Sequence, residues 1–190
     1  MEATLTGGGR IEMGRTAPPV AVAATALLDA EFDAFYATVH RYLLHRVFDR
    51  ELAEELTAET FYRLVTSLRR VRAGRRELQM WLLRIATNLA NSHYRRMRWR
   101  RLLLARWGLP RGATAVDVAV GNGATPTRAA QVRTAVAALP PKEQSVVVLR
   151  YYSHLSHDDM AEILGCQPEA VRTRLSRAIK RLRRRLGDAV

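Results

Sequence analysis

The chain has 190 residues, of which 48% are apolar, so it can build real hydrophobic cores as one ordinary domain or two small ones. Its formal net charge of +13 favours a polyanionic partner, with nucleic acid as the first expectation. The single cysteine, Cys166, cannot form an internal disulfide, and no C-x-x-C or His/Cys spacing predicts a metal site. We therefore expect neither a metal nor a cofactor.

Residues 1–26 are predicted to form a flexible leader. Arg10 and Arg15 precede the apolar run VAVAATALL, and the Ala-Thr-Ala within it imitates a signal-peptide cleavage site. The run is short, rich in weakly apolar alanine and opened by two prolines, so the secretory signal is the less favoured interpretation. No stretch reaches the length of a membrane span. The protein is expected to be cytoplasmic and associated with the nucleoid, without membrane contact.

Residues 27–106 are predicted to be a first helical domain. Apolar periodicity predicts one helix over 27–48, and Asp49 can cap a second helix over 50–69. The apolar positions of the second helix are Leu52, Leu56, Phe61, Leu64, Val65 and Leu68. Its other face is acidic, with Asp49, Glu51, Glu54, Glu55 and Glu59. A response to the helix dipole explains Glu51 but not Glu55 or Glu59, so this face predicts a basic partner other than DNA.

A basic loop over 69–76, RRVRAGRR, leads to a third predicted helix over 77–101. The C-terminal half of that helix interleaves aromatic and cationic residues, namely Tyr94, Arg95, Arg96, Arg98, Trp99, Arg100 and Arg101. This combination is typical of surfaces that follow a phosphate backbone and stack on unpaired bases. The alternative, a core-packed tryptophan among arginines with buried stems, is favoured for Trp81 over Trp99.

Residues 107–127 contain glycines and prolines without helical period and are predicted to be a flexible linker. Residues 128–190 are predicted to be a second domain of four short helices, the first two over 128–139 and 142–152. The fold class is therefore all-α, with two small helical domains.

The second domain ends in a predicted helix-turn-helix. Ser156 and Asp159 have the S-x-x-D spacing of a capping box, and Gly165 suits a left-handed helix terminus. Pro168 suits the first position of the following helix. A short helix, a tight turn and a second helix in this order place the second helix in a DNA major groove.

The second of these helices has one apolar and one basic side. Its apolar stripe consists of Val171, Leu175, Ala178 or Ile179, Leu182 and Leu186. Its exposed side carries Glu169, Arg172, Thr173, Ser176, Arg177 and Lys180. Between Ala170 and Gly187 there are eight basic residues and no acidic one, whereas a face that serves solubility alone would mix charges. We expect these side chains to contact DNA, with Arg172 and Arg177 directed at base edges or phosphates.

Three segments carry motifs of one protein family: AEELTAETFYRL at 53–64, WLLRIATNLANSHYRR at 81–96, and the stretch from LPPKEQ to IKRL at 139–182. They resemble the extracytoplasmic-function sigma factors of bacterial RNA polymerase, in the sigma-70 superfamily. The third match is highly specific. The resemblance implies a specificity subunit that binds core polymerase and directs promoter recognition, strand opening and transcription initiation, and that is not an enzyme.

The resemblance also implies three binding surfaces. Contact with the coiled coil of the polymerase beta-prime subunit is implied for Glu54, Glu55, Glu59 and Arg63. Contact with the minus-ten promoter element is implied for Arg75, Arg76, Asn88, Tyr94, Arg95, Arg96, Arg98 and Trp99. The helix-turn-helix side chains given above would read the minus-35 element. The polymerase beta flap and an anti-sigma factor are further implied partners.

Asn88 has two interpretations. Its amide can both donate to and accept from the edge of a base flipped out of the minus-ten duplex. It can also simply bond the neighbouring helix backbone.

The sequence departs from the family pattern at Glu55, Ala58 and Ser92, where the family prefers Asp, Gln and Asp. A helix-turn-helix regulator of the response-regulator output type is the alternative function, but no receiver-like βα alternation precedes the motif. The five histidines have neither a paired carboxylate nor metal spacing, so an enzyme is not expected.

Overall fold

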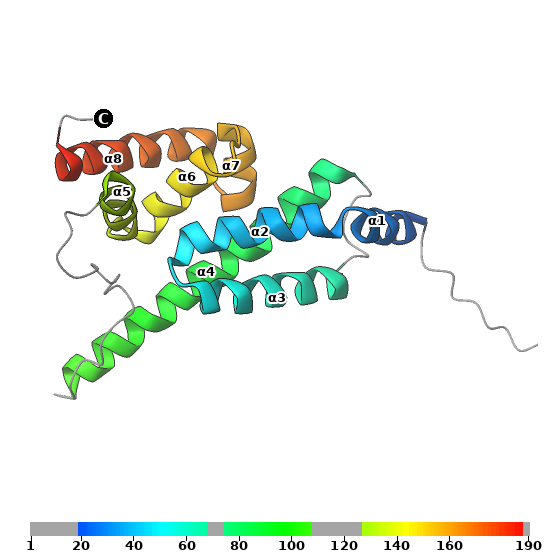
Figure 1. The fold of residues 1–190 in the computed structure, drawn as a ribbon, viewed down its shortest axis with the longest axis horizontal. Helices are drawn as coiled ribbons and strands as arrows, with labels where there is room; N and C mark the ends of the chain where they lie inside the picture. Colours follow the sequence, from blue (N-terminus) through cyan, green and yellow to red (C-terminus); the bar gives the residue numbers. More distant parts are fainter. Residues whose placement is uncertain (1–18, 68–73, 108–126, 188–190) are drawn as a thin grey trace, which may run out of the picture.

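The computed structural model describes residues 19–67, 74–107 and 127–187, and all regular structure in these ranges is helical (Figure 1). The helices are α1 (Pro19–Ala30), α2 (Phe32–Val47), α3 (Arg50–Ser67), α4 (Arg75–Arg106), α5 (Arg128–Ala137), α6 (Pro141–Tyr151), α7 (His157–Leu164) and α8 (Pro168–Leu186). The prediction of an all-α fold is confirmed.

Helices α2, α3 and the first half of α4 pack side by side as the first bundle, and α1 lies at its end (Figure 1). The apolar stripes meet inside it, since Leu43, Leu64, Leu78 and Ala86 are fully buried. Asp49 starts α3 as predicted, because its Oδ1 accepts a hydrogen bond of 3.0 Å from the backbone N–H of Leu52. The C-terminal part of α4 extends beyond the bundle.

Three predictions about helix boundaries were wrong. The helix predicted over 27–48 is two helices, which meet at Glu31, and α1 begins inside the range predicted as a flexible leader. Ala24 and Leu28 of α1 are buried, so the weakly apolar run there is a core-facing helix. Helix α4 begins at Arg75, so Arg75 and Arg76 are helical and not part of a loop. Residues 1–18 and 68–73, which include positions 69–73 of the predicted loop, lie outside the described residues, as do residues 108–126 of the linker predicted over 107–127.

Helices α5 to α8 form the second bundle, and their caps follow the predicted pattern. The Ser156 side chain accepts from the backbone N–H of Asp159 at 3.1 Å, and the Asp159 carboxylate accepts from the backbone N–H of Ser156 at 3.3 Å. Gly165 has φ 60°, the left-handed conformation that favours glycine. Val171 and Ala178 of α8 are fully buried, whereas Ile179 is only half-buried. The apolar stripe of α8 therefore includes Ala178 rather than Ile179.

The two bundles pack directly against each other. Helix α6 lies against α2, and α7 lies against the N-terminal part of α4 (Figure 1). Their buried apolar side chains form one continuous cluster that runs from Leu43 and Ala86 to Val147 and Met160. This contact was not predicted from the sequence, which indicated two domains joined by a flexible linker.

None of the helices described is long and apolar enough to cross a membrane. Within the same ranges, His, Cys, Asp and Glu side chains form no group of three that could hold a metal ion.

Candidate nucleic-acid and protein interfaces

The exposed side of α8 presents a continuous polar and basic surface. Thr173, Ser176, Arg177 and Lys180 are all exposed, and nothing in the described part of the chain covers them. Arg172 is also exposed, and its guanidinium forms an ion pair of 2.8 Å with Glu169, one turn earlier. Arg177 has no such acidic neighbour among the described residues, so its charge is not compensated locally.

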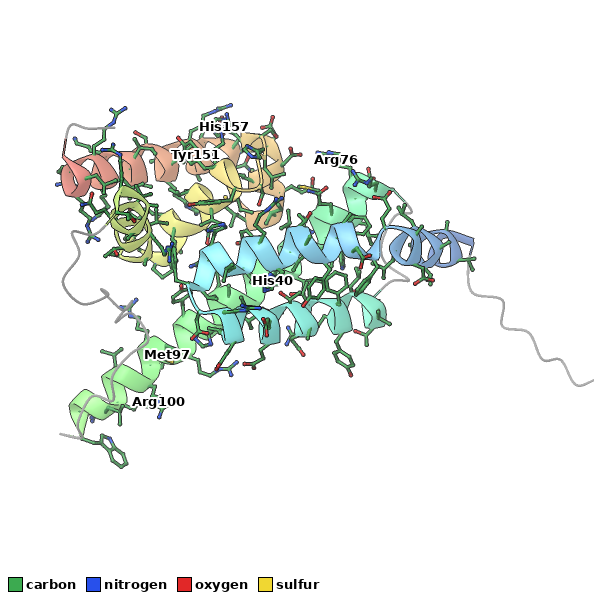
Figure 2. All side chains as sticks on the ribbon, in the orientation of Figure 1. His40, Arg76, Met97, Arg100, Tyr151 and His157 are labelled. Atoms are coloured by element: carbon green, nitrogen blue, oxygen red, sulfur yellow. The ribbon has the colours of Figure 1, made fainter. Side chains whose placement is uncertain are left out.

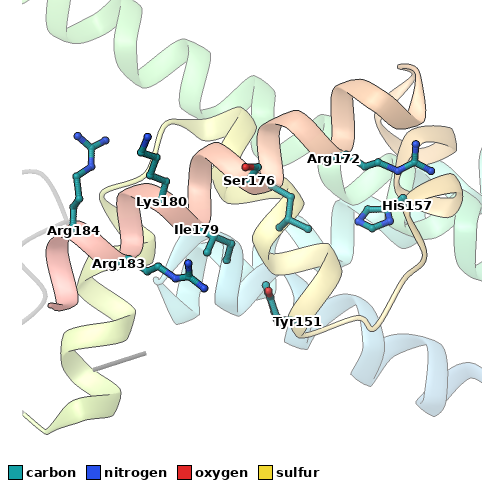
Figure 3. Close-up of a pocket in the computed structure, with 9 residues that line it drawn as sticks. Tyr151, His157, Arg172, Ser176, Ile179, Lys180, Arg183 and Arg184 are labelled. Atoms are coloured by element: carbon teal, nitrogen blue, oxygen red, sulfur yellow. The ribbon is translucent and has the colours of Figure 1, made fainter. Parts of the chain in front are cut away.

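A shallow groove runs along this side of α8 (Figure 3). Ile179 and Leu175 are its apolar lining residues, while Arg172, Lys180 and Arg183 supply cations. Its further lining residues are Tyr151, His157, Ser176 and Arg184. The groove therefore combines the positive charge and the hydroxyl donors that phosphate groups bind.

The extended end of α4 presents a second basic surface, and Met97 and Arg100 mark its position in Figure 2. Trp99 is 62% exposed and Trp107 is 74% exposed. Arg95, Arg96, Arg98 and Arg100 are exposed around Trp99. The alternative of a core-packed Trp99 is excluded by this exposure, whereas Trp81 packs against the core as predicted.

Asn88 lies on α4 about 16 Å along the helix axis from Trp99, at 1.5 Å per residue. Its side chain is exposed, and within the described residues its amide makes no hydrogen bond to the neighbouring helix backbone. The Asn88 amide is therefore available to bind the edge of a base in this structure.

Three other residues predicted for this surface are engaged elsewhere. The Tyr94 hydroxyl donates to the backbone carbonyl of Arg46 at 2.7 Å, so Tyr94 belongs to the structural framework here. Arg75 forms an ion pair with Glu31, and Arg76 forms one with Asp159 of the other bundle. Sequence reasoning could not place these long-range contacts.

The exposed face of α3 is mixed in charge. Glu54 is ion-paired with Arg50 at 3.0 Å and Glu59 with Arg63 at 2.6 Å. Glu55 is exposed and forms no ion pair within the described residues. Local arginines therefore offset much of the acidic character expected from the sequence.

The same face also carries apolar side chains that the sequence analysis did not assign to a surface. Val65 was predicted to be buried but is 59% exposed, and Tyr62 is 68% exposed. With Glu55 and Ala58 they follow a three- and four-residue spacing along one side of α3. Exposed tyrosine and valine beside a carboxylate are typical of a protein-binding surface.

The contact between the bundles centres on Arg46, which is fully buried. Its guanidinium donates to Asn91 Oδ1 at 3.0 Å, to the Pro141 carbonyl at 3.1 Å and to Gln144 Oε1. The same group lies 4.5 Å from the centre of the Tyr94 ring. Arg46 was not predicted from the sequence as a contact residue. A signal was present, because Arg46 follows Val39, Tyr42 and Leu43 on the apolar side of α2. An arginine on a buried side indicates a specific partner.

Further interactions cross the same contact. Arg84 donates to the Glu162 carbonyl at 2.7 Å, and the His45 and Tyr152 rings stack with centres 3.8 Å apart. Burial lowers the pKa of His45, and nearby arginines lower it further. Although partial burial opposes it, hydrogen bonds from Ser156 and Arg76 hold the pKa of Asp159 below its usual value.

Two family patterns match the chain: "Sigma-70 region 2" over residues 32–101 and "Sigma-70, region 4" over residues 129–182. The ECF RNA polymerase sigma factor BldN of Streptomyces coelicolor is 32% identical over 158 residues, which are 83% of this chain and 59% of BldN. The ECF RNA polymerase sigma factor SigW of Bacillus subtilis is 29% identical, over 85% of this chain and 88% of SigW.

A similar fold occurs in the sigma factor RpoE of Bartonella quintana, solved in complex with the anti-sigma factor NepR. The TM-score is 0.64 at 23% sequence identity, and the match covers 86% of this chain and 98% of that one.

Proposed function

Because the chain belongs to the sigma-70 family of RNA polymerase sigma factors, and to its extracytoplasmic-function type, we propose that its three exposed surfaces bind two promoter elements and core polymerase. The observation that carries the proposal is the distribution of these surfaces. Two one-signed basic surfaces lie on α8 and on the end of α4, and a mixed acidic and apolar face lies on α3. A regulator with a single helix-turn-helix would need neither the basic surface at the end of α4 nor the mixed face of α3.

The α8 surface is proposed to read the minus-35 element from the major groove. Arg177 is the strongest candidate for direct base contact, because its charge is exposed and has no adjacent carboxylate in the described structure. Arg172 must exchange its bond to Glu169 for a bond to DNA. Thr173, Ser176 and Lys180 are proposed to contact bases or phosphates beside them.

The α4 surface is proposed to bind the minus-ten element. Asn88 would receive the flipped base, and Trp99 with Arg95, Arg96 and Arg98 would hold the unpaired strand. Tyr94 is proposed to keep its structural role. Arg75 and Arg76 would join this surface only after they release Glu31 and Asp159.

The α3 face is proposed to bind the coiled coil of the beta-prime subunit, with Glu55 as the available charge and Tyr62 and Val65 as apolar contacts. The second bundle would contact the beta flap. An anti-sigma partner is also proposed, since the related fold of RpoE was solved with one. We propose that the chain acts in the cytoplasm with polymerase and is not itself a catalyst.

Reconstitution with core polymerase tests the proposal. The purified chain should bind core tightly and should produce run-off transcripts from a subset of genomic promoters, whereas the chain alone should bind promoter DNA weakly. A strong footprint by the chain alone, with no effect of core polymerase, would favour the response-regulator type of function instead.

A further inference from the structure

We infer that the strand-binding surface of α4 continues past Trp99 to Trp107, and that the two indole rings are separate stacking platforms for one unpaired nucleic-acid strand. The place of this strand in transcription initiation rests on the proposed function of α4. Strand binding itself is a property of the chain that can be measured without polymerase.

The last turn of α4 lies outside the segment that matches the family. The region 2 pattern ends at residue 101, whereas α4 continues to Arg106 and is closed by Trp107. The backbone N–H of Trp107 donates to the Leu103 carbonyl at 3.0 Å, so a regular helix end carries the indole. In Figure 2 this end of the helix lies beyond Arg100 and away from the first bundle. The role of Trp107 must therefore be sought in its own surroundings.

Trp107 lies on the side of α4 that carries the proposed minus-ten contacts. From Asn88, steps of seven and four residues lead to Arg95 and Trp99, and two further steps of four lead to Leu103 and Trp107. Steps of this size keep the five side chains within about a third of a turn. At 1.5 Å per residue, Asn88 and Trp107 are about 28 Å apart along the axis, and the two indoles about 12 Å.

Both indoles are available for stacking. Trp99 and Trp107 are mostly exposed, and neither ring stacks on another aromatic ring or lies over a cation within the described residues. Every base has a π-face that can stack on an indole, whatever the sequence. The distance of about 12 Å between the indoles corresponds to about three to four nucleotides at the 3.4 Å spacing of a stacked strand. The exposed Leu103 between them would supply apolar contact to the same strand.

The charge around the two indoles has one sign. There is no acidic residue between Leu78 and Trp107 in the sequence. The described and exposed arginines of this segment form no ion pair within the part of the chain that the structure describes; they are Arg95, Arg96, Arg98, Arg100 and Arg106. A phosphate backbone that passes along the indoles would neutralise these charges.

The position of the arginines disfavours other occupants of this exposed apolar strip. A second copy of the chain would bring two uncompensated groups of arginines together. A membrane surface would need the cations on the side opposite the apolar residues. Here Arg95 and Arg106, four residues before and seven after Trp99, lie on the same side as the indole. Alternating rings and cations on one side suit an unpaired strand.

Titration of the full chain with a labelled oligothymidine of about 12 nucleotides tests the inference. Trp107→Ala should weaken binding about tenfold, because one stacked base is lost. Trp107→Phe should stay within about threefold of the unmodified chain, because its ring still stacks. Trp107→Leu should be as weak as Trp107→Ala, because it keeps apolar volume but cannot stack. A duplex of the same length should bind all four proteins equally, since its bases are paired.

Two further variants separate stacking from general apolar contact and from charge. Leu102→Ala is the matched control, because it truncates an exposed apolar side chain in the same turn and should leave the oligothymidine affinity unchanged. Arg106→Ala should weaken strand and duplex alike and reduce the salt dependence of both. Trp107 is exposed at a helix end, so its substitution should leave the helices folded, which circular dichroism checks.

Equal affinity of Trp107→Ala and the unmodified chain for the oligothymidine would overturn the inference. Recovery by leucine as well as by phenylalanine would also overturn it and would assign the strip to a protein or lipid. A dimer of the unmodified chain that is lost in Trp107→Ala would assign the strip to a second copy instead. Failure of the unmodified chain to initiate transcription would overturn the proposed function, while the titration would still decide whether Trp107 binds an unpaired strand.

Discussion

At the scale of single residues, the structure changes which carboxylate on α3 is expected to matter. Glu54 and Glu59 each hold an arginine on the same helix, so a partner would have to compete with an existing ion pair. Glu55 lacks that competition and lies on the same side of α3 as the exposed Tyr62. A sequence pattern weighs the three acids equally, because i,i+4 pairing depends on which rotamers the arginines adopt.

Glu55→Lys should therefore weaken binding of core polymerase about tenfold, because it places a repulsive charge opposite the basic partner proposed for this face. Titration of labelled core measures the change. Glu51→Lys, exposed in the first turn of α3, is the control and should have little effect. Equal affinity of the two variants would remove Glu55 from the interface.

Asn88→Ala tests the proposed role in strand opening. The exposed amide has no partner to lose in the described structure, so the fold should be unaffected. Closed-complex binding to duplex promoter should stay near normal, while permanganate-detected opening should fall, and a premelted bubble template should restore much of the activity. An equal defect on duplex and bubble, or none on duplex, contradicts a flipped-base pocket.

At the scale of elements, α8 is the helix proposed to read the promoter sequence. Arg177→Ala should cost roughly 1 to 3 kcal/mol of binding and should relax preference at one minus-35 position, as expected for a bidentate contact to guanine. Arg172→Ala should cost less, because the free protein already pairs Arg172 with Glu169. Competition binding with single-base variants of the element measures both effects. An equal loss on every sequence would assign Arg177 to phosphate.

The elements themselves were largely predictable, because each has a local signal. The capping pair at Ser156 and Asp159, the left-handed Gly165 and the Asp49 cap all act within one turn, and each is found where the spacing places it. The break at Glu31 was missed, since the apolar repeat continues through it from α1 into α2. The contacts of Arg46 and Arg76 join residues far apart in the sequence, for which a single sequence carries no periodic signal.

At the scale of the whole molecule, two histidines link stability to pH. Burial lowers the pKa values of His45 and His93, and neighbouring arginines lower them further. As pH falls below about 6.5 the unfolded chain therefore binds more protons than the native protein, and the free energy of unfolding should decrease. Denaturant unfolding at pH 7.5 and pH 5.5 measures this decrease.

The matched control for that experiment is a double variant, His45→Gln with His93→Gln, in which the decrease between the two pH values should be smaller. Asp159 does not affect the comparison between pH 7.5 and pH 5.5. Its pKa is lowered from an already acidic value, so its contribution to the free energy of unfolding is lost only at more acidic pH. The same pH dependence in both proteins would show that other groups control it.

The buried guanidinium of Arg46 has a consequence for how the two bundles depend on each other. Arg46 lies on α2, but two of its acceptors, Gln144 and the Pro141 carbonyl, belong to α6 of the other bundle. The first bundle alone therefore cannot satisfy this cation as the folded chain does. A substitution at Gln144 should thus lower the stability of a bundle to which Gln144 does not belong, and the two halves of the chain cannot accept substitutions at this contact independently.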